Sequence, residues 1–167
     1  MKRILALCLL AVLCLSGCLR SEEPGNTVTF YYQRTETAYG SSDGVIASEQ
    51  RVITAANTDL HYLLSLYMNG PVDESLTLPL PGGTRLTDIR TEDGLLTLVF
   101  SSELSGLENM DLSISCACIS YTCFSLTDAE RVRIEAPAAN YGTPVSFTAS
   151  RDSFLLYDDT TREPDAS

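Results

Sequence analysis

The first 18 residues constrain this chain most, because they decide in which compartment the rest of it folds. Lys2 and Arg3 precede an almost wholly apolar run, residues 4–15, which ends in Leu15-Ser16-Gly17-Cys18. A short basic head, an apolar stretch and small residues before a cleavage point are the layout of a secretory signal peptide. The run is also shorter than the roughly 20 residues that span a bilayer. We therefore expect residues 1–17 to be removed and the remainder to fold outside the cytoplasm.

The end of this segment, Leu15-Ser16-Gly17-Cys18, resembles the lipobox of bacterial lipoproteins. In that family the cysteine thiol receives a diacylglyceryl group, and the peptide is cut just before it. The resemblance implies that Cys18 is the lipid-attachment residue and that the mature protein is anchored in the cell membrane on its extracytoplasmic face. Residues 18–27 would then form a polar tether. An ordinary signal peptide or an N-terminal membrane helix are the alternatives.

The charge of the mature chain limits its partners. A chain that begins at Cys18 keeps nine arginines, no lysine and all 22 acidic residues, so its formal net charge is −13. Such a surface is repelled by phosphate backbones and by anionic lipid headgroups. We therefore exclude nucleic acid as a partner and polybasic attachment to a membrane.

Hydrophobic periodicity predicts one α+β domain over residues 28–157, followed by an acidic tail at 158–167. The predicted strands are 28–34, 45–53, 84–90, 95–100 and 131–135, and residues 145–157 add an edge strand or pack on the domain. The second of these strands is expected to have a solvated middle and to form a loose hairpin with the first.

Local signals place the first helix and the turns. A helix is predicted between an N-cap at Asn57 or Thr58 and a C-terminal stop at Gly70-Pro71. Residues 71–83 hold three prolines and two glycines and are predicted to be irregular. Asp93-Gly94 between two β-rich runs predicts a tight hairpin. The order β-(β)-α-β-β-α-β predicts a small mixed or antiparallel sheet with two helices packed on one face.

Three cysteines remain in the mature domain, and all lie in residues 111–126. Because three thiols cannot all pair within one chain, a disulfide framework is excluded. The segment alternates like a strand but is long for one, so a helix is favoured. Its predicted core stripe is Leu112, Cys116, Ile119, Cys123 and Leu126, whereas Cys118 faces elsewhere. We interpret the cysteines as buried core thiols; a three-thiolate metal site or a disulfide through Cys118 are the alternatives.

Four motifs follow one another along the chain: Leu66-Tyr67-Met68-Asn69-Gly70-Pro71, Leu78-Pro79-Leu80-Pro81-Gly82-Gly83-Thr84-Arg85-Leu86, Val99-Phe100-Ser101-Ser102-Glu103-Leu104 and Arg131-Val132-Arg133-Ile134. In this order they resemble the GerM-type (GerMN) domain of sporulation and germination proteins. The similarity runs from about residue 28 to 136, which the resemblance implies is the core of the domain. One departure is the second helix, which is rich in serine and cysteine where family members are apolar.

The resemblance implies a ring-building type of fold and a non-catalytic role in an envelope complex. It implies protein partners, with self-association as one form of partnership, and no cofactor. A sheet with one covered face can present its edge or its open face to such a partner. The alternative is a lipoprotein that binds cell-wall glycan or a small ligand through its tyrosines, Tyr31, Tyr32, Tyr39 and Tyr62.

An enzyme is not expected, because no catalytic motif is present. His61 is the single histidine and has no matching nucleophile motif. A carboxylate pair for sugar cleavage could be drawn from the acids on predicted turns, Glu92, Asp93, Glu103, Glu108 and Asp111. Acids on turns usually contact only water. Gly82-Gly83 precedes a strand and is predicted to be a turn, not a phosphate-binding loop. No catalytic, cofactor-binding or metal-ligating residue is therefore predicted.

Overall fold

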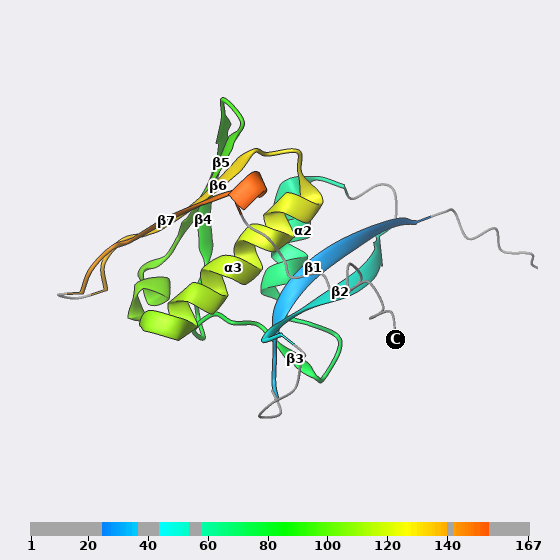
Figure 1. The fold of residues 1–167 in the computed structure, drawn as a ribbon, viewed down its shortest axis with the longest axis horizontal. Coiled ribbons are helices and arrows are strands. Elements are labelled where there is room, and N and C mark those ends of the chain that lie inside the picture. Colours follow the sequence, from blue (N-terminus) through cyan, green and yellow to red (C-terminus); the bar gives the residue numbers. More distant parts are fainter. Residues whose placement is uncertain (1–24, 37–43, 54–57, 140–141, 154–167) are drawn as a thin grey trace, which may run out of the picture.

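The computed structural model describes residues 25–36, 44–53, 58–139 and 142–153 (Figure 1). The predicted signal peptide, Cys18 and the tail at 158–167 lie outside these ranges. The elements are β1 (Asn26–Arg34), β2 (Ile46–Ile53), α2 (Leu60–Met68), β3 (Leu76–Thr77), β4 (Leu86–Glu92), β5 (Leu95–Phe100), η1 (Ser102–Gly106), α3 (Asn109–Leu126), β6 (Arg131–Ala136), β7 (Val145–Ser150) and η2 (Arg151–Ser153). None of the helices in the described part is both long and apolar enough to cross a membrane.

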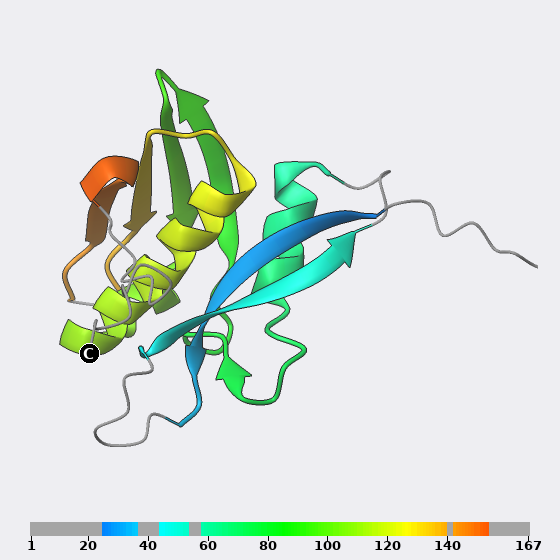
Figure 2. The same cartoon turned by 45° about the vertical axis from the view of Figure 1, so that its right-hand side comes forward.

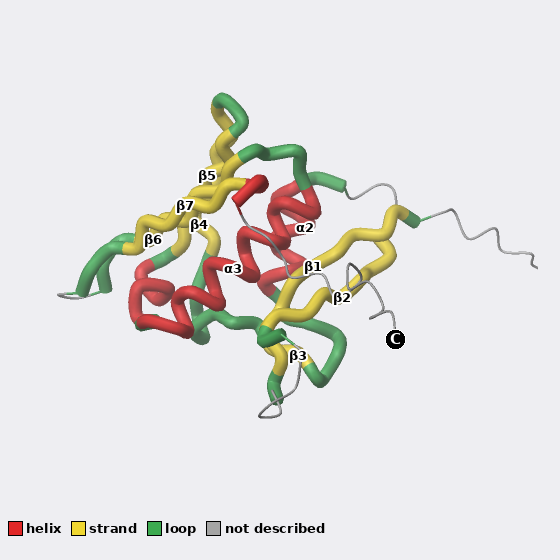
Figure 3. The backbone as a smooth tube through the Cα atoms, in the orientation of Figure 1, coloured by secondary structure: helices red, strands yellow, loops and turns green. Residues whose placement is uncertain are grey.

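The α+β class is confirmed, but the strands form two sheets instead of the single small sheet expected. Sheet A has the order β2-β1-β3, and sheet B has the order β4-β5-β6-β7. Only β5 and β6 pair in parallel; the other neighbours are antiparallel. Figure 3 shows the two groups of strands on either side of the helices. One sheet and two sheets can be built from strands that follow one another in the same order along the chain. The order of the strands therefore does not tell which of the two forms.

Helix α3 lies between the two sheets, with sheet B on one side and β1 on the other (Figure 2). Its residues Cys116, Ile119 and Cys123 are at most 1% exposed and pack in the same core as Leu98 and Ile134 of sheet B. Because the helix is covered on two sides, it needs no polar face over its middle turns. This explains why its sequence is only weakly amphipathic.

Hydroxyl groups on α3 complete the free edge of β1. Thr122 Oγ1 accepts the N–H of Tyr31 at 2.9 Å, and Ser125 Oγ donates to the carbonyl of Thr29 at 2.5 Å. A buried strand edge without such partners would leave backbone groups unsatisfied. Thr122 and Ser125 thus give two hydroxyl groups of this helix a structural role beside β1.

Helix α2 covers the core face of sheet A through Leu63, Leu64 and Tyr67. The helix starts later than predicted: its N-cap is Asp59, so Thr58 does not cap it, and Asn57 lies outside the described residues. Its end is confirmed.

Gly70, the residue after the C-cap, has φ +89°, a conformation in which a Cβ is disfavoured.

The proline-rich connection 71–83 contains one short strand, contrary to the expectation of a wholly irregular segment. In β3, Leu76 and Thr77 pair with the end of β1. Leu76 is 6% exposed, so burial of its side chain against the core accounts for the pairing. The glycine turn is confirmed, since Gly83 has φ +85° and Thr84 N–H donates to the Pro81 carbonyl at 3.1 Å.

The predicted hairpin is confirmed as β4–β5. Asp93 and Gly94 have φ values of 48° and 72°, as a type I′ turn requires. The edge strand expected within 145–157 is also confirmed, as β7, which pairs with β6.

Candidate functional site

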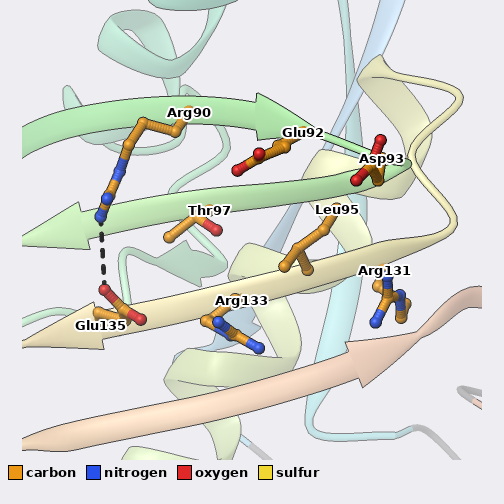
Figure 4. Close-up of a pocket in the computed structure, with 8 residues that line it drawn as sticks. All are labelled: Arg90, Glu92, Asp93, Leu95, Thr97, Arg131, Arg133 and Glu135. Atoms are coloured by element: carbon orange, nitrogen blue, oxygen red, sulfur yellow. Dashed lines mark ion pairs between the residues drawn. The ribbon is translucent and has the colours of Figure 1, made fainter.

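The face of sheet B that α3 does not cover is a lattice of mostly polar side chains, here called the open face. It has three rows in register across β4, β5 and β6: Glu92–Leu95–Arg131, Arg90–Thr97–Arg133 and Asp88–Val99–Glu135. Most of these side chains line a shallow hollow of about 290 Å³ (Figure 4). The alternation of sheet residues places them together because every second residue of a strand shares a face.

The ion pairs on the open face leave charges of both signs without a partner among the described residues. Arg90 contacts Asp88 at 3.1 Å and Glu135 at 3.5 Å. Since 60% of the Arg90 side chain is exposed, each pair contributes less than about 1 kcal/mol. Arg133 makes one long hydrogen bond to β7, at 3.4 Å, and Arg131 makes no ion pair within the described ranges. The guanidinium groups of Arg131 and Arg133 are therefore available to a ligand.

A shallow charged surface of this kind is suited to recognition. Guanidinium groups bind carboxylates and other oxygen acceptors through forked hydrogen bonds. Thr97, at the centre, is only 9% exposed and so offers little of its hydroxyl to a bound molecule. The arrangement can hold an acidic or polar protein surface against the sheet.

A second polar cluster, on β2, was missed by sequence reasoning. The sequence predicts a solvated middle for this strand, and this holds for Ser48 and Gln50 but not for Glu49 and Arg51, whose side chains are only 10% and 15% exposed. Arg51 Nε donates to Glu49 Oε1 at 2.5 Å. Its terminal nitrogens donate to the carbonyls of Leu66 and Gly70, at 3.2 and 2.6 Å, and to the Tyr32 hydroxyl at 3.1 Å.

The carboxylate of this cluster holds the loop that follows α2. Glu49 Oε2 accepts the N–H groups of Val72 and Asp73 at 2.7 and 2.8 Å. Burial by itself would raise the pKa of Glu49, but the hydrogen bonds from Asp73, Arg51 and Val72 together keep this pKa below its ordinary value. Every charge in the cluster has a partner, so we assign it to fixing α2 on sheet A and not to ligand binding.

The three cysteines of α3 lie in the core. Cys116 is 1% exposed, and Cys118 and Cys123 are fully buried. The prediction that Cys118 faces away from the core is wrong, because α3 is enclosed on more sides than a single sheet allows. Burial raises the pKa of the Cys116 thiol to about 11 and the pKa values of Cys118 and Cys123 to about 12. All three are thiols, not thiolates, at neutral pH.

The candidate catalytic residues are spread over different surfaces. His61 lines a hollow of about 450 Å³ between α2 and the start of β4, beside Arg85. Glu92 and Asp93 lie at the hollow of the open face, whereas Glu108 lines another one between α3 and β7. Among the described residues, no three histidine, cysteine or acidic side chains are grouped as metal ligands.

Glu103 and Asp111 lie at helix starts. Glu103 is in the first turn of η1, where the Ser101 hydroxyl and its own backbone N–H lower the pKa of the carboxyl. Asp111 is in the first turn of α3. Acids in these positions interact favourably with the helix dipole, which is a structural role.

The tyrosines do not form one surface. Tyr32 is fully buried and Tyr31 lies on the other face of β1, as the sequence predicts. The Tyr31 ring contacts Tyr121 with centroids 5.4 Å apart. Tyr62 is 38% exposed and belongs to α2, on the core side of sheet A. Tyr39 lies outside the described residues.

Comparison with known proteins places this fold. A solved structure of the tandem GerMN domains of the sporulation protein GerM from Bacillus subtilis is similar, with a TM-score of 0.52 and 17% identity. The match covers 78% of this chain and 48% of that one, so this chain spans about half its length. A structure described as a "Putative Lipoprotein" from Clostridium perfringens matches with a TM-score of 0.44 and 16% identity, over 77% of this chain and 89% of that chain. No curated protein matches significantly.

The profile of one protein family covers most of the described fold. The Germane family, described as "Sporulation and spore germination", matches residues 29–136, from β1 to the end of β6. The matched range includes every residue of the open face, of which Glu135 is the last along the chain, and the whole cluster around Arg51. The chain therefore belongs to the Germane family of sporulation and spore germination.

Proposed function

We propose that this protein is a lipid-anchored, non-catalytic interaction domain on the extracytoplasmic face of the cell membrane. It works within a protein complex of sporulation, germination or a related envelope process. The family assignment supports the process, and the lipobox-like sequence ending in Cys18 supports the anchor. The alternative function, binding of cell-wall glycan or a small ligand, needs several tyrosine rings on one surface. The glycan-binding form is disfavoured because Tyr31 and Tyr62 lie on different sides of sheet A.

The observation that carries this proposal is the open face. The hollow is lined by three arginines and three acidic residues, so it is locally neutral on a chain whose mature charge is strongly negative. The hollow is shallow and mixes both signs of charge, which suits a protein surface better than a small enclosed substrate. The partner chemistry that fits is a polar protein surface that carries charges of both signs.

Site-specific photocrosslinking tests this function in cells that produce the full chain. A photoreactive residue replaces Arg133 on the open face, and a matched control replaces Val72, which is 79% exposed and lies in the loop after α2. We expect a crosslinked protein product from position 133 and none from position 72. Equal products from both positions, or none from position 133 during growth and sporulation, would contradict the proposed role of the open face.

A further inference from the structure

The outer edge of β2 is regular, and within the described residues its backbone groups pair with no other strand. β1 and β2 pair without a bulge over the whole of β2. In this register Ser48 lies opposite Tyr31, and Gln50 lies opposite Thr29. Because the N–H of Tyr31 and the carbonyl of Thr29 are directed to α3, the backbone groups of Ser48 and Gln50 are directed away from β1. No described element pairs with them.

The edge of sheet B at β4 is protected in the usual way. A register shift between Leu86 and Asp88 interrupts its pairing. Its side chains include three charges, Asp88, Arg90 and Glu92. Bulges and charges on an edge strand hinder pairing with another chain.

The edge at β2 has neither the bulge nor the solvent-facing charges of β4. Its solvent-facing side chains, Ser48, Gln50 and Val52, are uncharged, and Val52 is 75% exposed. The two charges of the strand, Glu49 and Arg51, are turned to the core face, where they neutralise each other. This pair needs no partner from another chain, but a strand added beside β2 places its own residues next to these charges, where opposite charges are favourable and like charges repel.

We propose that two copies of this chain pair through β2, antiparallel, about a two-fold axis at Gln50. The strand is self-complementary in this register, because Glu49 lies opposite Arg51 of the partner subunit, and the reverse pair follows by symmetry. Moving the axis by one residue would place Glu49 opposite its own copy, or Arg51 opposite its own copy. Like charges directly opposite are unfavourable, so charge selects the axis at Gln50.

The pairing joins the two copies of sheet A into one continuous sheet. About six backbone hydrogen bonds form between the outward groups of Ser48, Gln50 and Val52 in the two copies. Ser48 then lies opposite Val52 of the partner subunit. This inference does not rest on the proposed function, because self-pairing can be measured with no other protein present.

Disulfide trapping in the purified full-length protein tests the register. Paired residues at the axis have Cα atoms about 5.5 Å apart, within the range of a disulfide. We expect oxidised Gln50→Cys to give mainly a band at twice the monomer mass, which reductant removes. Met110→Cys, at an exposed site in the first turn of α3, is the matched control, and the unaltered chain reports on native thiols. No dimer band for Gln50→Cys, or the same band for Met110→Cys, overturns the proposal.

A charge exchange at the same position tests specificity without cysteine chemistry. Gln50→Lys and Gln50→Glu each place like charges at the axis, and neither side chain enters the core, since Gln50 is exposed. Each variant alone should lose dimer at least tenfold in sedimentation across a concentration series. A mixture of the two should recover it as a heterodimer captured through different tags. If both variants dimerise like the unaltered chain, or if the unaltered chain stays monomeric throughout, the proposal is wrong.

Discussion

Removing the Arg51 side chain is expected to destabilise the domain strongly. In Arg51→Met the carbonyls of Leu66 and Gly70 lose a donor, and the buried Glu49 carboxylate loses its charge partner. The guanidinium group also lies 5.1 Å from the Phe30 ring centroid, a favourable contact that disappears.

The size of the loss follows from burial. Breaking a buried ion pair from one side costs about 3–5 kcal/mol. The lower end applies here, because the Glu49 and Arg51 side chains remain 10% and 15% exposed and water can partly replace the lost bonds. We therefore expect about 3 kcal/mol, or a fall in Tm of about 10 °C for a domain of this size.

Urea and thermal unfolding of residues 22–167, followed by circular dichroism, measure this loss. Arg90→Met is the matched control, because Arg90 also makes two ion pairs but its side chain is 60% exposed. The control should change the free energy of unfolding by less than about 0.5 kcal/mol. A loss below about 1 kcal/mol for Arg51→Met, or a similar loss for both variants, would show that the cluster does not hold α2 on sheet A.

Four further outcomes are expected. The pKa of Glu49 in the folded protein lies below its ordinary value of 4.5. In unfolding titrations, the stability advantage of the unaltered chain over Glu49→Gln should therefore be full above pH 4.5 and shrink as the pH falls through the folded pKa. A difference in stability that does not change with pH would contradict this. Gly70→Val should lower the stability by about 1 kcal/mol or more in thermal melts, because the positive φ of Gly70 is unfavourable for a residue with a Cβ. A steric clash does not contribute to this loss, because a Cβ at Gly70 has no neighbour within 4 Å. The three buried thiols should react with a thiol reagent only on unfolding, so rapid labelling of the native domain would refute their burial. Cys18→Ala should leave uncleaved precursor or release the protein from the detergent phase, and a mature-sized variant that stays in that phase would refute lipid attachment.

The sequence predicted most of the local structure of this domain. Gly70-Pro71 and Asp93-Gly94 are turn signals whose backbone conformations depend on few neighbours, and both were confirmed. The parallel placement of β6 beside β5 and the division into two sheets depend on contacts far along the chain. No local pattern records these contacts, so one sheet and two sheets are equally compatible with the strand order.

The two clusters show why sites are harder to predict than elements. On β2, Glu49 and Arg51 alternate with Ser48 and Gln50, and charged residues in such a strand normally face water. Two features of the sequence could have indicated that Glu49 and Arg51 face the core. Ile53, on the same face of the strand, is apolar, and the two charges are of opposite sign. The open face required the register of β4, β5 and β6, which sequence periodicity cannot supply.

The position of β1 beside α3 also sets an order of events in time. The hydrogen bonds that complete its edge at Thr29 and Tyr31 join residues 96 and 91 positions apart, so this part of the edge is covered only after most of the chain has been made. Such distant closures are slow compared with a local hairpin. An early hairpin of β1 and β2 would therefore wait, with one edge of β1 uncovered, for α3. A chain that is made in N-to-C order would be most exposed to misassociation during that interval.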